Sequence, residues 1–239
     1  MVKVVYPSRK LIPRDVTVIV VNYRTLKLTK ACIESVRRFM PDCRIITVDN
    51  CSKDGSTQYL QHLADTEEDV SIVITKKNVG HGRGLELGAR QCKTRLFLIL
   101  DSDTEVKHFR ILPKMIEPFN IYQRVYATGA LRLVSAAGNT VNKPEVPYIH
   151  PFAALFDRHL YEQLPRFDLH GAPLLKNMRA AFRERLVCLG IRGLGQDIIH
   201  HRRGTRQGRR GWESLLSNSR KRCPCDPSLS ADAGDQERT

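Results

Sequence analysis

The chain has 239 residues, of which 41% are hydrophobic, and this is enough to bury the core of one large domain with an appendage. Its formal net charge of +14 predicts an anionic partner, such as a nucleotide, a nucleic acid or an acidic membrane surface. The seven cysteines are odd in number and scattered, which favours reduced thiols in the cytosol. No apolar run approaches the length of a membrane span, so we expect a cytoplasmic protein, with peripheral attachment to the inner face of the membrane as the alternative.

The first hundred residues alternate between short apolar runs and amphipathic stretches. Strands are predicted at 16–21, 44–48, 70–75 and 96–100, with helices that end near residues 39, 63 and 92. Strands that alternate with helices form a parallel sheet with helices on both of its faces. The predicted fold class is therefore α/β, with a Rossmann-like, mostly parallel sheet.

The second half of the chain is less regular. Its periodicity predicts a strand at 125–134 and helices at 109–119, 157–165 and 174–188, the last of them basic. We expect a hairpin turn at 137–139, an extended connection marked by Pro144, Pro147 and Pro151, and a loop at 167–173.

Two carboxylates follow the apolar strand at 96–100. Asp101 and Asp103 are two positions apart, so in an extended segment they point to the same side. Open α/β sheets bind their ligands at the carboxyl ends of the strands, and two hard oxygen ligands there suit Mg²⁺ or Mn²⁺. The alternative is a plain turn, because Asp-Ser-Asp is also good turn chemistry. Polar residues at Asn22 and Asp49 end two more strands on the same edge, which favours a metal and nucleotide site.

Glycines are dense between Asn78 and Gly84. A glycine backbone, which has no side chains, can approach a ligand closely. The N-terminus of a helix that follows such a segment favours the binding of anions. The spacing is not the dinucleotide-binding fingerprint. A ligand cradle and a flexible loop both remain open for this segment.

Four short patterns, taken in order, are similar to those of family 2 glycosyltransferases with the GT-A fold. Val18–Tyr23 resembles the first strand of the family, and Val48–Ser56 resembles its VDN-x-S-x-DGS loop. Asn78–Gly88 resembles the N-x-G…G segment, and Leu100–Asp103 the D-x-D motif. The resemblance covers about residues 14–135 and implies transfer of a sugar from a nucleotide-diphosphate donor, usually with inversion.

The resemblance also implies roles for single residues. Asp49 would contact the nucleotide base, Asp101 the ribose or the metal, and Asp103 the divalent metal on the diphosphate. The residues expected to bind the nucleotide sugar lie in these motifs or directly beside them; they are Asn22, Tyr23, Arg24, Asp49, Asn78, Gly80, Arg83, Asp101 and Ser102.

We expect the second half of the chain to complete the site. Asp168 is the candidate base that takes the proton of the acceptor hydroxyl, and His170 is the close alternative. His200 and His201 precede a basic run, which looks like the segment that returns to the diphosphate in many family members. One of these imidazoles would ligate the metal beside Asp101 and Asp103.

Three regions are predicted along the chain. Residues 1–175 would form the GT-A domain, with a nucleotide-sugar half at about 14–105 and an acceptor half at about 106–175. A basic segment at 176–222 and a disordered tail at 223–239 would follow. The arginines of the basic segment favour a glycan or lipid-linked acceptor of the cell envelope, reached at an anionic membrane surface, and a solvated basic tail is the alternative.

Two alternatives come from other classes of protein. In a haloacid-dehalogenase-type phosphatase, Asp101 would attack phosphorus and Asp103 would protonate the leaving group. That motif prefers Thr or Val where this chain has Glu105. A nucleic-acid-binding protein would use the arginine-rich last third, but few aromatic residues lie there to stack on bases, so no nucleic acid is expected as a partner.

Overall fold

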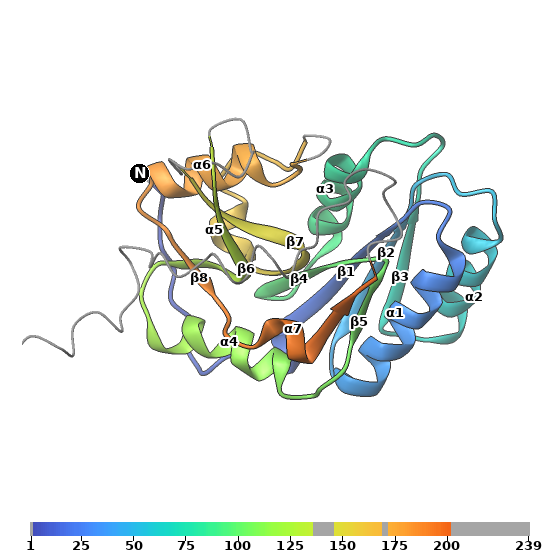
Figure 1. Cartoon of the computed structure of the whole chain (residues 1–239), viewed down its shortest axis with the longest axis horizontal. Helices are drawn as coiled ribbons and strands as arrows, with labels where there is room; N and C mark the ends of the chain where they lie inside the picture. The colour runs from blue at the N-terminus through green and yellow to red at the C-terminus, as the bar shows by residue number, and fades with distance from the viewer. Residues whose placement is uncertain (1, 136–145, 169–171, 202–239) are drawn as a thin grey trace, which may run out of the picture. The chain divides into compact units, whose positions relative to one another are not determined.

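A seven-stranded sheet forms the centre of the computed structural model, which describes residues 2–135, 146–168 and 172–201. The strand order is β3-β2-β1-β4-β7-β6-β8 (Figure 1). The strands of this sheet are β1 (Val16–Asn22), β2 (Arg44–Asp49), β3 (Val70–Ile74), β4 (Leu96–Asp101), β6 (Val125–Val134), β7 (Val146–Asp157) and β8 (Val187–Gly190). A small second sheet pairs β5 (Thr104–Val106) with β9 (Ile198–His200).

Seven α-helices and one short 3-10 turn complete the described part of the chain. They are η1 (Pro13–Asp15), α1 (Leu26–Phe39), α2 (Ser56–Thr66), α3 (His81–Gln91), α4 (Ile111–Ile121), α5 (Arg158–Tyr161), α6 (Leu175–Arg183) and α7 (Leu194–Asp197). Helices α3 and α6 lie on one side of the sheet, and α1 and α4 lie on the other (Figure 1). None of these helices is long and apolar enough to cross a membrane.

The centre of the sheet follows from the apolar runs of β1 and β4. The two strands pair in parallel, from Val16 opposite Leu96 to Val21 opposite Asp101, and β2 pairs in parallel on the other side of β1. Residues 96–100 are buried on both faces, as the unbroken apolar run predicts. The predicted mostly parallel α/β sheet is confirmed, and β7 is its antiparallel strand.

The glycine-rich segment is not a flexible loop throughout, because a helix takes up its second half, and its role as a ligand cradle stays a prediction. Helix α3 begins at His81, so Gly82, Gly84 and Gly88 lie inside a helix. A Cβ atom at Gly84 would lie 2.7 Å from Val21 Cγ1, and one at Gly88 would lie 2.5 Å from Ile19 Cγ2. These glycines therefore let α3 approach β1 more closely than any side chain would allow.

The second half of the chain contains more strand than predicted. The expected extended connection with Pro147 and Pro151 is most of β7, which pairs with both β4 and β6. Pro151 falls where the pairing with β6 is interrupted, between the pairs Ile149–Leu131 and Ala154–Gly129. A proline has no N–H to donate, so an interruption of the ladder accommodates it. The expected hairpin turn at 137–139 and Pro144 lie outside the described residues.

The predicted boundary at residue 175 is also corrected. The expected basic helix at 174–188 ends at Arg183, and the chain then continues as β8, which pairs in parallel with β6 in the main sheet. Strand β9 pairs with β5, directly after the D-x-D motif. Residues 176–201 are thus part of the same folded unit as the strands before them.

We expect Gly88→Ala to lower the free energy of unfolding by about 1–3 kcal/mol, because its methyl group would overlap Ile19. Gly195→Ala is the matched control, since this residue is also helical and no atom lies within 4 Å of a Cβ built there. Urea unfolding of both variants measures the difference. A Gly88→Ala protein as stable as the control would contradict the close contact of α3 with β1.

Asp197 links α7 to α4 and makes part of the stability dependent on pH. Its buried carboxylate accepts hydrogen bonds from Arg110 Nε (2.7 Å) and Lys114 Nζ (2.9 Å). Burial would raise the pKa of Asp197, but the two cations outweigh burial and lower this pKa below its ordinary 3.8. A carboxylate with a lower pKa in the folded chain stabilises the fold above the unfolded pKa, and this contribution is lost as pH falls through the folded pKa.

Asp197→Asn should therefore cost about 1–3 kcal/mol at neutral pH, and this cost should shrink as the pH falls below about 4. Asp42→Asn is the control, because Asp42 pairs with Arg14 at 3.6 Å on the surface, where both side chains are more than half exposed. The measurement is the free energy of unfolding of the three proteins across a pH series. An Asp197→Asn cost that is the same at every pH would contradict the ion pairs.

Candidate functional site

Three polar residues end three neighbouring strands at one edge of the sheet. Asn22 lies opposite Asp49 in the pairing of β1 with β2, and Val21 lies opposite Asp101 in the pairing of β1 with β4. The three strands are parallel, so their carboxyl ends meet at this edge. This is the edge at which open α/β sheets bind ligands.

Asn22 and Asp49, both buried, form the centre of a hydrogen-bond network that supports this edge. Asn22 Nδ2 donates to Asp49 Oδ1 (2.7 Å) and to Ser52 Oγ (3.0 Å), and Asn22 Oδ1 accepts from Thr29 Oγ1 (2.7 Å). Asp49 Oδ2 accepts from Thr57 Oγ1 (2.6 Å) and from the Ser52 N–H (3.1 Å). Neither side chain has exposed surface. Their hydrogen bonds hold the ends of β1 and β2 and the loop after β2 in place. The expected contact of Asp49 with a nucleotide base stays a prediction.

Tyr23 and Arg24 lie exposed at the rim directly after Asn22. The Arg24 guanidinium lies 5.1 Å from the centre of the Tyr23 ring, and the Arg24 backbone N–H donates to Ser52 Oγ (2.9 Å). Arg24 has a φ of 56°, a left-handed conformation that turns the chain from β1 into α1. These two side chains are accessible to a ligand.

A second set of polar contacts holds the segment before α3. Asn50 Nδ2 donates to Asn78 Oδ1 (2.9 Å), which also accepts from the Gly80 N–H (2.9 Å). The Val79 N–H donates to Asn50 Oδ1 (2.8 Å). Gly80 has a φ of 88°, a conformation that favours glycine, and it leads directly into α3. Asn50 thereby fixes where α3 starts, a role that the sequence analysis did not assign to it.

Asp101, Asp103 and His200 form a cluster of potential metal ligands. One ligand atom from each residue lies within 4.8 Å of the others. His200 Nε2 is 3.1 Å from Asp103 Oδ1 and 3.8 Å from Asp101 Oδ2. The three residues come from the end of β4, the turn after it, and the last residue of β9. Chain segments almost one hundred residues apart thus meet at one point.

The chemistry of this cluster suits a divalent cation. Asp101 Oδ1 is buried and accepts no hydrogen bond from the residues that the structure describes, although His81 Nε2 lies 3.4 Å away. Burial raises the pKa of Asp101, and Asp103 raises it further, while His81 and His200 act in the opposite direction. A bound cation would compensate the burial of this carboxylate. The two carboxylates suit either Mg²⁺ or Mn²⁺, whereas an imidazole is a more usual ligand for a transition metal such as Mn²⁺ than for Mg²⁺.

His200 is held in place from two sides. The pairing of β9 with β5 puts His200 opposite Thr104, and the Phe152 ring stacks on its imidazole, with 5.2 Å between ring centres and 9° between ring planes. His201 points elsewhere: its Nε2 lies 2.6 Å from Glu105 Oε1, outside the cluster. Of the two adjacent histidines proposed as metal ligands, the fold brings His200 to the carboxylates.

The remaining predicted site residues that the structure describes are Ser102, Arg83 and Asp168. Ser102 Oγ is 3.0 Å from Thr25 Oγ1, which joins the D-x-D turn to the start of α1. Asp168 forms an ion pair with Arg83 on α3, with Arg83 Nε 3.2 Å from Asp168 Oδ1. Both side chains are at least half exposed. His170 lies outside the described residues.

Two histidines at the site were not predicted. His81 begins α3 and faces Asp101, and His150 on β7 has its ring centre 6.2 Å from that of His200. Burial lowers the pKa of His150 to about 3, so its imidazole is neutral. His81 lies in the glycine-rich motif, so its position in the sequence could have indicated a site residue. No motif surrounds His150, which reaches the site only because β7 pairs antiparallel with β4.

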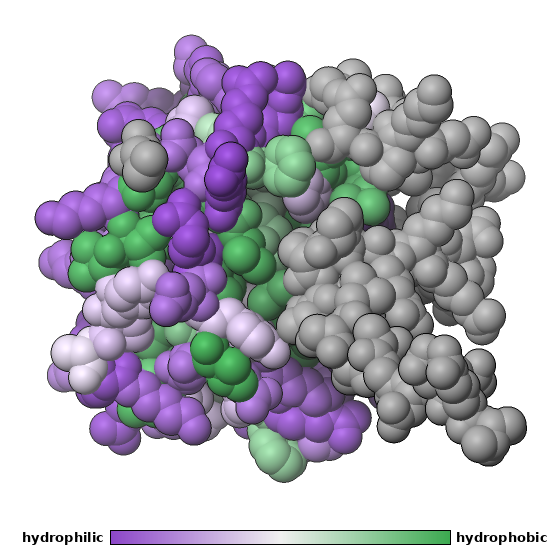
Figure 2. Space-filling view, turned by 90° about the vertical axis from the view of Figure 1, so that its left-hand side faces the viewer, coloured by the Kyte–Doolittle hydropathy of each residue, from purple (hydrophilic) through white to green (hydrophobic). Residues whose placement is uncertain are grey.

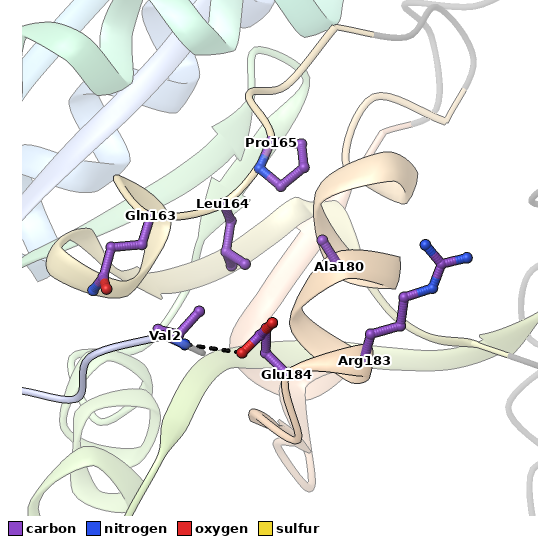
Figure 3. Close-up of a pocket in the computed structure, with 7 residues that line it drawn as sticks. All are labelled: Val2, Gln163, Leu164, Pro165, Ala180, Arg183 and Glu184. Atoms are coloured by element: carbon purple, nitrogen blue, oxygen red, sulfur yellow. Dashed lines mark hydrogen bonds between the residues drawn. The ribbon is translucent and has the colours of Figure 1, made fainter.

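A separate pocket of about 300 Å³ lies between the N-terminal segment and α6. Figure 3 shows its lining, in which the Val2 N–H donates to Glu184 Oε2 (2.9 Å). None of its lining residues belongs to the predicted site; they are Val2, Gln163, Leu164, Pro165, Ala180, Arg183 and Glu184. The face of the molecule seen in Figure 2 carries hydrophilic side chains interspersed with apolar ones, as on an ordinary protein surface.

Comparison with known families identifies the chain. The family model described as Glycosyl transferase family 2 matches residues 17–186. The chain belongs to this family. A protein of Mycobacterium tuberculosis (strain CDC 1551 / Oshkosh), named "Putative glycosyltransferases", is 31% identical over 93 residues, which are 39% of this chain and 25% of that protein. The chain thus spans a quarter of the length of this relative.

Solved structures share the fold of this family member. The mannosyltransferase PcManGT from Pyrobaculum calidifontis, in complex with GDP-Man and Mn²⁺, matches with a TM-score of 0.58 at 18% identity, over 74% of this chain and 54% of that one. GalNAc-T7 with UDP, GalNAc and Mn²⁺ matches with a TM-score of 0.60 at 13% identity, over 74% and 41%. Glucosyl-3-phosphoglycerate synthase from Mycobacterium tuberculosis, in complex with phosphoglyceric acid, matches with a TM-score of 0.55 at 14% identity, over 74% and 69%. At these identities the similarity shows the fold, which is the predicted GT-A type.

We expect Asp103→Ala and His200→Ala each to weaken Mn²⁺ binding about tenfold or more, because each removes one of three potential ligands. His201→Ala is the matched control, since this neighbouring imidazole pairs with Glu105 outside the cluster. Electron paramagnetic resonance of free Mn²⁺ measures the affinity directly. If the control weakened Mn²⁺ binding as much as His200→Ala does, the assignment of the two histidines would be wrong.

Proposed function

We propose that this protein transfers a sugar from a nucleotide-diphosphate donor to an acceptor hydroxyl, with inversion at the sugar carbon. The cluster of Asp101, Asp103 and His200 at the carboxyl ends of the parallel strands carries this proposal. The membership of the chain in glycosyl transferase family 2 supports the same reaction class. Two proteins of similar fold were solved with nucleotides and Mn²⁺, which supports this choice of donor and metal.

In this proposal the donor lies across the ends of β1, β2 and β4. The exposed Tyr23 and Arg24 contact the nucleotide from the rim. Asn22 and Asp49 hold the strand ends beneath it, and Asn78 and Gly80 fix the start of α3. Arg83 and Ser102 lie on the two segments that flank the cluster. Together these residues orient the donor so that its sugar faces the acceptor.

The reaction forms one bond and breaks another. The acceptor oxygen bonds to the anomeric carbon while the bond from that carbon to the diphosphate oxygen breaks, and the electron pair leaves with the diphosphate. A divalent cation, Mg²⁺ or Mn²⁺, would stabilise this leaving group without a proton. Asp101, Asp103 and His200 would hold the cation.

The acceptor hydroxyl must lose its proton as it attacks. Asp168 is the proposed base, and its ion pair with Arg83 links the loop that carries it to the first turn of α3. His170 is the alternative. A hexose as the transferred sugar, a glycan or lipid-linked acceptor of the cell envelope, and attachment to an anionic membrane stay predictions from the sequence.

The phosphatase alternative requires Asp101 as a nucleophile on phosphorus. The position of Asp101 between two histidines and beside Asp103 suits a metal ligand better, because three potential ligand atoms converge there. The family match likewise favours sugar transfer over phosphate hydrolysis.

Asp168→Asn should lower turnover about 100-fold or more, because general-base catalysis contributes at least that much, and donor affinity should stay unchanged. The measurement is sugar transfer with a nucleotide sugar chosen by a thermal-shift panel in the presence of Mn²⁺. Asp65→Asn is the control for loss of an exposed carboxylate.

Full turnover of Asp168→Asn together with a loss in His170→Ala would assign the base to His170. If no nucleotide sugar stabilised the wild-type protein and excess EDTA changed nothing, the proposed function itself would be wrong.

A further inference from the structure

We propose that His150 is a further donor-binding residue of this site, whose Nε2–H group donates a hydrogen bond to an oxygen of the donor diphosphate. This inference deepens the proposed function and rests on it. Neither the family motifs nor the metal cluster includes this histidine.

The pairing of β7 with β4 brings His150 to the site. Strand β7 pairs with β4 as far as Ala153 opposite Leu100, so the residues before Ala153 run alongside the D-x-D turn. The His150 ring lies 5.5 Å from the Phe152 ring and 6.2 Å from the His200 ring, measured between centres. Phe152 in turn stacks on His200. His150 is therefore a neighbour of the potential metal ligand without belonging to the cluster of ligands.

A backbone contact fixes which nitrogen of His150 carries the proton. The Phe152 N–H donates to His150 Nδ1 (3.3 Å), and a backbone amide can only donate. Nδ1 is then the unprotonated nitrogen, and in a neutral imidazole the proton is on Nε2. The ring is partly exposed, and among the described residues no partner is found for Nε2.

This tautomer decides what His150 can do. Because Nε2 already carries a proton, His150 in this tautomer cannot serve as the base that deprotonates the acceptor. A lysine or arginine here would repel a cation held by the neighbouring cluster, whereas a neutral N–H donor can bind an anionic oxygen without this repulsion. Hydrogen bonds to charged acceptors are also the stronger ones. As the diphosphate departs, its negative charge grows, and a donor fixed in advance stabilises that charge.

The test compares nucleotide binding by the wild-type protein, His150→Phe and His150→Gln. Calorimetric titrations with UDP and with GDP, both in saturating Mn²⁺, identify the nucleotide that binds. His150→Phe keeps the ring shape but lacks the donor, so the affinity for this nucleoside diphosphate should fall about tenfold or more. His150→Gln keeps an N–H donor at a similar reach and should stay within about threefold of wild type. The matching nucleoside, which has no phosphate, should bind all three proteins equally in ligand-observed NMR.

His159→Phe is the matched control, because it replaces a surface histidine of α5 by the same residue. Equal diphosphate affinity of His150→Phe and wild type would overturn the inference while leaving the proposed function intact. If wild type bound neither UDP nor GDP with Mn²⁺ and no nucleotide sugar of the thermal-shift panel stabilised it, the proposed function would fail and the inference with it.

A second measurement does not depend on the folding of His150→Phe. Long-range nitrogen–proton NMR of the histidine rings, with His150 assigned by its loss in His150→Gln, should show the Nε2–H tautomer. The Nε2 resonance should shift when the nucleoside diphosphate is added. An Nδ1–H tautomer, or no shift at saturation, would contradict the inference.

Discussion

The parallel pairing of β1 with β2 and β4 is the constraint on which the rest of this structure depends. Its register puts Asn22 beside Asp49 and Val21 beside Asp101, so that three strand exits lie in one row. A shift of β1 by one residue would also turn Ile19 and Val21 away from α3, because successive side chains of a strand point to opposite faces. The close contact of Gly84 and Gly88 with β1 adds a second restraint on the same strands.

Two carboxylates at this edge have opposite environments. Asp49 has every oxygen satisfied by hydrogen bonds from its own neighbours and has no exposed surface. Asp101 has a buried oxygen that accepts no hydrogen bond from the described residues, and its pKa is raised chiefly by burial. A carboxylate whose oxygens all accept hydrogen bonds stabilises the loop that surrounds it. A buried carboxylate oxygen without a hydrogen bond is stabilised when a cation binds to it. Of these two carboxylates, Asp49 therefore supports the strand ends, and Asp101 is the potential metal ligand.

The return of the chain after β8 completes the potential metal centre. Strand β9 pairs with β5 immediately after the D-x-D turn, and the backbone N–H of His201 donates to the Asp103 carbonyl (2.8 Å). This pairing turns the ring of His200 towards the carboxylates and that of His201 towards Glu105. Because successive residues of a strand point to opposite sides, two adjacent histidines could not both reach the same cation. The stacking of Phe152 on His200 then connects β7 to the same centre.

The sequence by itself determined the parallel half of this protein and the row of polar strand ends. The apolar runs at 16–21 and 96–100 predicted central strands, and the alternation with helices predicted their direction. Those inferences succeeded because burial on both faces and short crossovers leave a direct mark on residue order. The tertiary structure alone decided that Pro147 and Pro151 lie in a sheet strand, that the glycines of α3 serve packing, and that His81 and His150 face the site. These features depend on contacts between segments far apart in the chain, and hydrophobic periodicity within one segment carries no record of its distant neighbours.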